Sequence, residues 1–419
     1  ASSWCKRRND LMKRVVVTGV AGITALGEDW DAIECQLRGR KNSVRYMPEW
    51  DYIEVLNTRV AAPIDSFVTP EHYPRKALRG IGRVAMLSVR ASELALMDAD
   101  LLNNPIIHSG EMGVSYGSSS GSVEPIRAFA QMLETGSMQD VTSASYIQMM
   151  PHTAAVNIAL FFELKGRIIP TSSACTSGSQ GIGYAYEAIR FGRQTMMLAG
   201  GSEEISAPSS AVFDTIFATS SKNDTPDLTP RPFDESRDGL VVGEGAATLV
   251  LEEYEHAKAR GAKIYAEIIG FGCNSDGRHI TQPEKETMSI AMQQALDDAG
   301  IPPDVIAYIS AHGTATDRGD IAETQATASI FNNKVPISSM KSYIGHSLGA
   351  CGAIEAWWAI EMMHKKWFAP TINLEKIDPA CGHLDYITDM GRNIDAEFIM
   401  SNNFAFGGIN TSLIFKRIV

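Results

Sequence analysis

The sequence predicts an α/β fold in which helices and short strands alternate. Runs of β-branched and apolar residues recur along the whole chain, and segments with helical periodicity separate them. The 419 residues are 44% hydrophobic and 21% charged, so the chain can bury a large core. Because no composition break or Gly/Ser-rich linker divides the chain, we expect one compact unit, although length alone favours two domains.

The individual elements follow from these patterns. The first apolar run, VVVTGVAGITALG, is typical of a buried strand followed by a turn and the start of a helix. The predicted strands cover residues 15–18, 112–116, 167–170, 195–199, 247–251, 264–271, 306–310, 335–337 and 409–415. The predicted helices cover residues 77–99, 177–191, 285–299, 320–330 and 349–364.

Two segments of the chain share one pattern. RIIPTSSACTSGSQGIGYAYEAIRFGRQTMMLAGG and VPISSMKSYIGHSLGACGAIEAWWAIEMMHKKWFAPTIN each pass from a strand through a Pro-x-Ser-Ser turn into a helix rich in small residues. Such an echo suggests two similar halves packed back to back. Each half would then contribute a reactive residue to the centre of the molecule.

Charge and cysteine usage narrow the class of protein. The net charge of −12 disfavours nucleic-acid binding, because the surface repels backbone phosphates. No apolar run is long enough for a membrane span, and Glu355 and Glu361 mark the Trp-rich helix as a core helix. Six cysteines without a CxxC pair argue against a zinc ribbon or a disulfide framework and favour a reducing cytoplasm. We exclude residues 1–11 from the fold as a leader or vector-derived segment; a signal peptide is the weaker alternative.

Cys175 is the strongest candidate nucleophile. It lies in SSACTSGSQGIG, directly before a predicted helix. A cysteine at a helix N-terminus can have its thiolate stabilised by the helix dipole and by free N–H groups, and its small neighbours leave room for a substrate carbonyl. The alternative is that Cys175 is a buried small apolar residue.

Three further motifs surround this candidate. His312 lies in ISAHGTATDRGD after a predicted strand, and His346 lies in KSYIGHSLGACGA before a predicted helix, five residues after Lys341. The motif SNNFAFGGIN, residues 401–410, has a Gly-Gly turn that can aim a backbone N–H at a developing oxyanion. Core histidines and an ordinary hairpin turn are the alternatives, but together with Cys175 the motifs indicate a catalytic constellation.

In this order, the four motifs resemble those of the β-ketoacyl-acyl carrier protein synthases, the condensing enzymes of the thiolase fold. The resemblance also includes RPFDESRDGLVVGEGA (231–246) and LEEYEHAKARGAKIYAEIIGFG (251–272), and it covers nearly the whole chain. It implies two pseudo-symmetric βαβαβαββ halves that form a layered α-β-α-β-α core. The halves would cover residues 12–262, with Cys175, and residues 263–419, with the two histidines.

The resemblance also implies residue roles. Cys175 would accept the growing acyl chain as a thioester, and His312 and His346 would bind the malonyl carbonyl during decarboxylative condensation. Phe406 matches the gating phenylalanine, and its backbone N–H would join that of Cys175 in an oxyanion hole. The implied supporting residues are Lys341, Glu355, Asp320, Glu323, Phe404, Gly407 and Gly408. No metal, redox or other cofactor is implied.

The pattern of one cysteine and two histidines is that of the elongating synthases. A catalytically silent chain-length-factor subunit resembles the same family but lacks the nucleophile, so Cys175 argues against that alternative. Three residues of NNFAFGGIN depart from the usual NSFGFGGTN: Asn403, Ala405 and Ile409. Together with AHGTATDRGD and SYIGHSLGACGA, this motif is most similar to the synthases of aryl polyene clusters. Fatty acid elongation and polyene assembly both remain open.

The expected partners follow from the resemblance and from charge. Acyl carrier proteins are acidic, and this chain places Arg75, Lys76, Arg79 and Arg83 within nine residues of a predicted helix. These residues form either a carrier-protein docking patch or an ordinary solvated helix face. The resemblance also implies a dimer, either of two identical chains or with a chain-length-factor-like subunit.

Overall fold

The computed structural model describes residues 12–332 and 335–418. Its centre is an eleven-stranded sheet in the order β13-β11-β10-β15-β16-β9-β1-β8-β6-β4-β5. Its strands are β1 (Val15–Thr24), β4 (Met112–Gly117), β5 (Ile168–Thr171), β6 (Met196–Glu203), β8 (Gly245–Glu253), β9 (Ala266–Ser275), β10 (Ile306–Ser310), β11 (Pro336–Ser338), β13 (Asp385–Tyr386), β15 (Phe398–Ala405) and β16 (Ile409–Arg417). The leader predicted for residues 1–11 lies outside the described residues.

The sheet contains two halves with one topology. The strands β1, β4, β5, β6 and β8 of the first half correspond to β9, β10, β11, β15 and β16 of the second. In both halves the spatial order is third, second, fourth, fifth and first, and the fifth strand is antiparallel to its neighbours. The halves join where Val15–Val17 of β1 pairs with Ala266–Ile268 of β9. The repeat predicted from the sequence echo is therefore confirmed at the level of topology.

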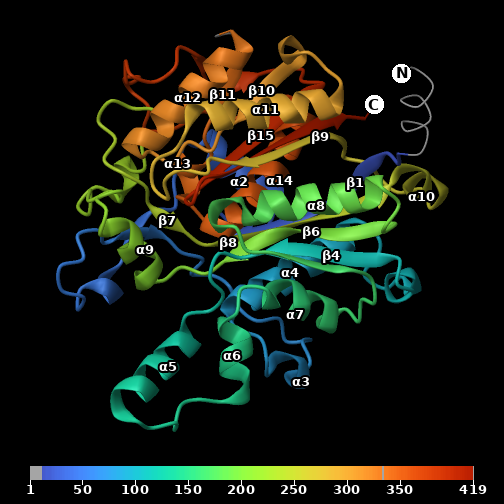
Figure 1. Cartoon of the computed structure of the whole chain (residues 1–419), viewed down its shortest axis with the longest axis vertical. Coiled ribbons are helices and arrows are strands. Elements are labelled where there is room, and N and C mark those ends of the chain that lie inside the picture. Colours follow the sequence, from blue (N-terminus) through green and yellow to red (C-terminus); the bar gives the residue numbers. More distant parts are fainter. Residues whose placement is uncertain (1–11, 333–334, 419) are drawn as a thin grey trace.

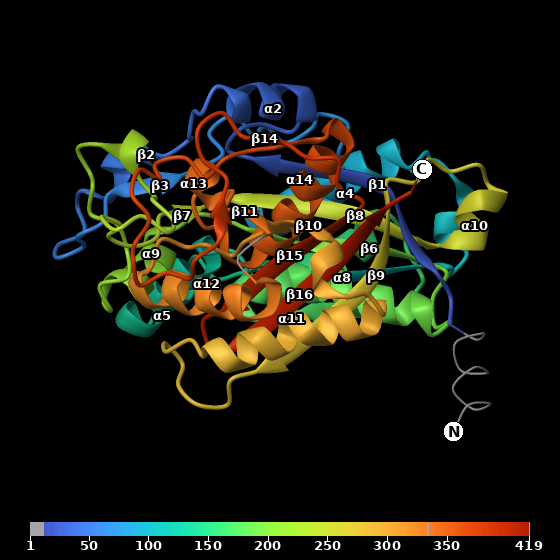
Figure 2. The ribbon, with the colours of Figure 1, turned by 90° about the horizontal axis from the view of Figure 1, so that it is seen from above.

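The helices complete five layers, which Figure 1 shows from top to bottom. α11 and α12 cover the outer face of the second half, and Figure 2 shows them side by side. α8 and α14 pack against each other between the halves, and α4 and α7 cover the outer face of the first half. These helices are α4 (Arg83–Asp98), α7 (Thr153–Phe161), α8 (Ser177–Arg190), α11 (Lys285–Ala299), α12 (Asp317–Phe331) and α14 (Cys351–Lys365). The predicted α-β-α-β-α layering is confirmed.

The chain also forms shorter helices and two small sheets outside this core. In Figure 1, α5 and α6 project from the bottom of the molecule, and Leu133 and Met138 are exposed there. The remaining helices are α2 (Trp30–Arg38), α3 (Arg75–Leu78), α5 (Glu124–Thr135), α6 (Ser143–Met149), α9 (Ala207–Asp214), α10 (Tyr254–Ala259) and α13 (Lys341–Ile344). Two small sheets contain β2 (Arg45–Tyr46), β3 (Val60–Ala62) and β7 (Val242–Gly243), and β12 (Trp367–Phe368) and β14 (Arg392–Asn393).

The two central helices are buried and approach each other closely. Trp357 and Trp358 of α14 are 2% and 0% exposed, as expected for a helix whose residues are mostly apolar. A methyl group on Gly178 of α8 would lie 2.9 Å from the backbone nitrogen of Ala353 of α14. A methyl group on Gly352 would lie 2.8 Å from Ser179. These glycines therefore permit the short distance between α8 and α14.

Two strand predictions were incomplete. β1 does not turn after Thr18 but continues to Thr24, with a bulge before Gly19. The glycines in this strand make room for neighbours, because a methyl group on Gly19 would lie 2.5 Å from the Ala95 carbonyl oxygen of α4. β15 was not predicted as a strand at all. It lies between β10 and β16 and carries buried asparagines in place of the expected apolar alternation.

The helix predicted over 77–99 is wrong as a single element. It is divided into α3 and α4, with Gly80 and Gly82 between them. A methyl group on Gly82 would lie 2.7 Å from the Cβ of Ser122, so this close contact needs a glycine. The other predicted helices and strands are present with ends shifted by a few residues. In the described parts of the chain, no helix has both the length and the apolar character that crossing a membrane demands.

Candidate active site

Cys175 lies in a tight turn between β5 and α8. The turn is a 3-10 segment, Ala174–Thr176, and it begins with Ala174 at a φ of 52°. An alanine in this left-handed region is strained, so neighbouring contacts must hold it there. Ser177 supplies them, because its Oγ accepts from the Ser173 N–H over 3.0 Å and donates to the Ala174 carbonyl over 2.7 Å. The turn places the Cys175 thiol beside the N-terminus of α8, as predicted.

Burial sets the resting state of this thiol. Cys175 is 4% exposed, and burial raises the pKa of the thiol above its ordinary value. A hydrogen bond from the backbone of Phe406, the charge of Lys341 and the backbone of Cys175 itself oppose this rise in pKa without cancelling it. The expectation of a stabilised resting thiolate is therefore not met, although the predicted N–H groups do face the sulfur.

His346 is the nearest titratable partner of Cys175. It follows α13, and its own N–H donates to the Val241 carbonyl over 2.6 Å. The Leu348 N–H donates to Nδ1 over 3.3 Å, so the ring proton lies on Nε2, 3.1 Å from the Cys175 sulfur. Burial and the charge of Lys341 hold the pKa of His346 well below its ordinary value, which keeps the imidazole neutral.

His312 approaches from the end of β10. Its ring centroid lies 5.1 Å from that of His346, and the two planes are nearly perpendicular at 89°. Lys341 Nζ lies 3.2 Å from Nδ1 of His312 and donates to it, so Nε2 carries the proton here as well. Burial, Lys341 and His346 lower the pKa of His312 well below its ordinary value. Both histidines therefore offer neutral Nε2–H donors.

A buried ion pair holds Lys341 in place. Lys341 and Glu355 are 1% and 2% exposed, and the ammonium donates to one carboxylate oxygen. The other carboxylate oxygen accepts from Nδ2 of Asn403 over 2.7 Å. Burial lowers the pKa of Lys341, but nearby negative groups, Glu355 among them, outweigh it and raise the pKa overall. The lysine thus remains charged.

Two buried acids shape the loop that carries His312. Glu323 accepts from the N–H groups of His312 and Gly313, both over 2.7 Å. Asp320 accepts from Thr314 over 2.9 Å and from Ala315 over 3.1 Å. Burial raises the pKa of Asp320 to about 6 and that of Glu323 to about 8, although these hydrogen bonds oppose the rise.

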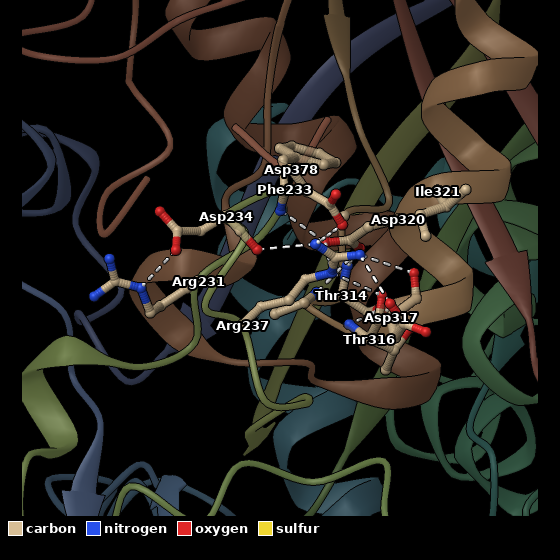
Figure 3. A network of polar contacts seen from close by, with 12 residues as sticks. Arg231, Phe233, Asp234, Arg237, Thr314, Thr316, Asp317, Asp320, Ile321 and Asp378 are labelled. Atoms are coloured by element: carbon tan, nitrogen blue, oxygen red, sulfur yellow. Dashed lines mark hydrogen bonds and ion pairs between the residues drawn. The ribbon is translucent and has the colours of Figure 1, made fainter. Parts of the chain in front are cut away.

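Figure 3 shows the network that extends this support to the surface. Asp320 also accepts from the Phe233 N–H over 2.7 Å and lies 3.7 Å from Arg237. Arg237 pairs further with Asp378 over 2.7 Å and with Asp317 over 3.3 Å, and its side chain is only 3% exposed. One arginine from the RPFDESRDG segment therefore ties three acidic residues together behind His312.

The β15–β16 turn forms the last side of the site. Phe406 packs edge-on against Phe213, with ring centroids 5.6 Å apart. Gly407 and Gly408 have φ angles of 96° and 74°, which only glycine adopts easily. The ring centroid of Phe404 lies 6.2 Å from that of His312. The turn thus borders both the thiol and one imidazole.

A cavity of about 520 Å³ reaches these groups. Cys175, His312 and His346 line this cavity, together with the aromatic residues Phe404 and Phe406. Ligand atoms of Cys175, His312 and His346 lie within 4.8 Å of one another, a spacing that could hold a metal ion. The charged Lys341 beside His312 disfavours a second cation there. The arrangement fits acyl transfer through a thiol.

The sequence-predicted residues divide into two groups. The structure brings Cys175, His312, His346, Lys341 and Glu355 together, and the other predicted supporting residues surround them. The four basic residues do not share one helix, because Arg75 and Lys76 lie on α3, Arg79 lies at its end and Arg83 begins α4.

Arg83 is further committed to an internal contact. It pairs with Glu244, a carboxylate that is fully buried.

The sequence did not predict two residues that support the site. They are Arg237 and Cys351, and the thiol of Cys351 donates to the Cys175 carbonyl over 3.3 Å. Asn403 drew attention only as a departure from a motif, and that departure was the available signal.

Comparisons with known proteins agree with this geometry. The model for the N-terminal domain of beta-ketoacyl synthases matches residues 12–257, and the model for their C-terminal domain matches residues 265–375. The chain belongs to the beta-ketoacyl synthase family. The family and the thiolase-like fold expected from the sequence motifs are thereby confirmed.

Individual relatives extend over nearly the whole chain. The 3-oxoacyl-[acyl-carrier-protein] synthase 1 of Haemophilus influenzae is 36% identical, covering 97% of this chain and 99% of its own. A crystal structure of a beta-ketoacyl synthase from Burkholderia phymatum is 67% identical, covers 97% of this chain and 100% of its own, and has a TM-score of 0.96. The ishigamide ketosynthase/chain length factor is 29% identical, with the same coverages and a TM-score of 0.89.

Proposed function

We propose that this protein is a β-ketoacyl-acyl carrier protein synthase, which condenses malonyl-carrier with an acyl group held on Cys175. One observation carries the proposal. The Cys175 sulfur lies 3.1 Å from Nε2 of His346, and a second neutral imidazole, His312, lies beside His346 and lines the same cavity. A nucleophile and two hydrogen-bond donors around one small volume are what a condensation of two thioesters requires.

The first step loads the enzyme. The Cys175 sulfur attacks the acyl thioester carbonyl, its S–C bond forms, and the bond to the carrier sulfur breaks. The thiol proton leaves with the carrier thiolate, so the charge balances. Backbone N–H groups of Cys175 and Phe406 face the sulfur and would stabilise the tetrahedral oxyanion. The N-terminus of α8 adds a favourable dipole.

The second step makes the new carbon–carbon bond. The malonyl thioester oxygen accepts from Nε2–H of His312 and of His346, which stabilises the enolate formed when the bond to the carboxylate breaks and CO2 leaves. The enolate carbon then attacks the acyl carbonyl on Cys175, and the cysteine sulfur departs as a thiolate, which takes up a proton from water to restore the thiol. Lys341 keeps Nδ1 of His312 occupied, so that Nε2–H points to the substrate.

Two variants separate these steps. Cys175→Gln should abolish acyl transfer and leave malonyl decarboxylation, because both imidazoles remain. His346→Ala should keep self-acylation and lower condensation by about 100-fold or more, since one enolate donor is gone. Intact-protein mass spectrometry with acyl- and malonyl-carrier protein measures the adduct and the product. An adduct on a cysteine other than Cys175 would refute the assignment.

The same experiment distinguishes the pathway. We infer an aryl polyene synthase from NNFAFGGIN and its neighbouring motifs, so a conjugated aryl-enoyl group should be accepted in preference to a saturated one. Preference for the saturated chain would indicate ordinary fatty acid elongation. The alternative of a silent chain-length-factor-like scaffold is disfavoured, because Cys175, His312, His346 and Lys341 are all in place.

Partners remain part of the proposal. The name of the Haemophilus relative includes an acyl carrier protein, and Arg75, Lys76 and Arg79 of this chain are exposed and available for an acidic partner. The dimer is either of two identical chains or with a chain-length-factor subunit such as that named for the ishigamide protein. A cytoplasmic location and a boundary between residues 262 and 263 stay predictions.

A further inference from the structure

Asn403 contacts the buried ion pair of the site. It belongs to β15, is 0% exposed, and donates from Nδ2 to one oxygen of Glu355 over 2.7 Å, whereas Lys341 donates to the other oxygen. In the described part of the chain, these are the two donors that reach the carboxylate. We propose that Asn403 is a positioning residue of the condensation step, which fixes the ionised Glu355 so that Lys341 donates to His312. This inference rests on the function proposed above.

The amide nitrogen of Asn403 also lies near two other groups of the site. This Nδ2 atom lies 3.5 Å from Nδ1 of His312 and 3.7 Å from the sulfur of Cys351. That sulfur donates to the carbonyl of Cys175 over 3.3 Å. One side chain therefore borders the nucleophile's turn, an enolate-binding imidazole and the ion pair that orients it.

The amide oxygen supports a functional interpretation. Oδ1 of Asn403 is buried without a hydrogen-bond partner. An unpaired buried amide oxygen opposes folding, so a residue that only filled this space would be better apolar. The amide fits because residue 352 is glycine: a methyl group at this position would lie 2.7 Å from Oδ1. The hydrogen bond from Asn403 to the Glu355 carboxylate offsets the cost of the unpaired oxygen.

A pH dependence follows from this geometry. Burial raises the pKa of Glu355, whereas Lys341 and the hydrogen bond from Asn403 lower it. Without Asn403 the pKa rises further, the carboxylate protonates at a higher pH, and Lys341 loses its anchor. Activity that requires ionised Glu355 is lost as the pH falls through its pKa, so the acidic limb of the pH profile moves to higher pH.

Other titratable groups lie near Glu355 and Lys341 and could shift the profile too. They come from the turn before α8, from β10 and the loop after it, from α12, from the loop after α13 and from the start of α14. They are Cys175, Tyr308, His312, Glu323, His346 and Cys351. Asn403 itself lies near His312 and Cys351, so a displaced limb reports on the contact between Asn403 and Glu355 only where the effect of the Asn403 variant disappears once Glu355 is replaced.

The experiment compares two asparagines of one strand. For Asn403→Ala, the acidic limb of the condensation profile should rise by about one pH unit, the size expected for one hydrogen bond to a charged group. Asn402→Ala is the control. Asn402 is also 0% exposed on β15, but its side chain accepts from Ser412 over 2.7 Å. This variant should leave the limb where it is in the unchanged protein.

Asn403→Ser is a second variant, for use if Asn403→Ala does not fold. Asn403→Ser has no amide oxygen to bury, and its shorter hydroxyl reaches less far towards Glu355, so the limb should move in the same direction. A double-mutant cycle gives a further readout. In a Glu355→Gln background, Asn403→Ala should change the condensation rate by less than about twofold, because the group through which it acts is gone.

The outcomes separate the two proposals. If the unchanged protein makes no condensed product at any pH, the proposed function fails, and this inference fails with it. If the protein is active and the limb of Asn403→Ala or Asn403→Ser coincides with that of Asn402→Ala, the positioning role is wrong. Equal losses from Asn403→Ala with and without Glu355→Gln would overturn it as well.

Discussion

Replacing Lys341 tests whether the centre of the site is a buried ion pair. The variant Lys341→Met keeps an unbranched side chain one atom shorter than that of lysine and removes its charge. Glu355, 2% exposed, then keeps only the hydrogen bond from Asn403. Removing one partner of a buried pair leaves an uncompensated charge and typically costs about 3–5 kcal/mol. We expect the free energy of unfolding at pH 8 to fall by about this amount.

The deficit should depend on pH. Lys341 is among the causes that lower the pKa of Glu355, so the pKa of this carboxyl rises in the variant. An unfolded glutamate ionises near pH 4.3. Between that pH and the raised folded pKa, the folded variant binds a proton that the unfolded chain releases, which stabilises it as the pH falls. The deficit against the unchanged protein should therefore be smaller at pH 5 than at pH 8.

Urea unfolding at both pH values measures the effect. The double variant Lys341→Met with Glu355→Gln removes both charges and should recover most of the lost stability, because no ion is left buried. A deficit below about 1 kcal/mol at pH 8, or a double variant no more stable than the single one, would show that the pair is not a desolvated salt bridge. Lys341 would then not be the buried charged group that donates to Nδ1 of His312.

Two further predictions use other parts of the structure. Gly82→Ala should lower the free energy of unfolding by about 1–3 kcal/mol, because its methyl group would lie 2.7 Å from Ser122 Cβ. The control Gly80→Ala has open space around it and should be near neutral. Equal thermal midpoints for the two variants would contradict this prediction. Alkylation of Cys175 should accelerate as the pH rises towards and beyond the ordinary thiol pKa, because burial raises the pKa of this thiol. Lys341→Met should react more slowly than the unchanged protein, because the charge of Lys341 lowers the pKa of Cys175. A rate that is flat above neutral pH would contradict the raised pKa.

The sequence predicted what depends on local pattern. Alternating strands and helices, the repeated Pro-x-Ser-Ser turns and the ordered motifs around Cys175, His312 and His346 are all visible in short windows. The symmetric topology and the convergence of these residues follow from them. β1 was cut short because Gly19 suggested a turn, when it serves instead to let α4 approach. Glycine has both uses, and only the tertiary neighbours distinguish them.

Other features depend on contacts between distant parts of the chain. β15 is a buried strand with polar residues, so its pattern did not identify it. Asn403 and Glu355 are 48 residues apart, and nothing local to either predicts their hydrogen bond. The pKa of Cys175 is raised rather than lowered, because burial outweighs the backbone hydrogen bonds and the charge of Lys341 that oppose it. Desolvation depends on the folded core and cannot be predicted from a short sequence motif.

The close packing of α8 against α14 sets the distances between the reactive groups. Cys175 precedes α8 and Glu355 lies on α14, so the helix spacing permitted by Gly178 and Gly352 sets how far the thiol lies from the charged pair behind the imidazoles. Neither repeat holds a complete set of reactive groups. Catalytic geometry is therefore a property of how two similar halves touch, and a single added methyl group between them would disturb it before any reactive residue changed.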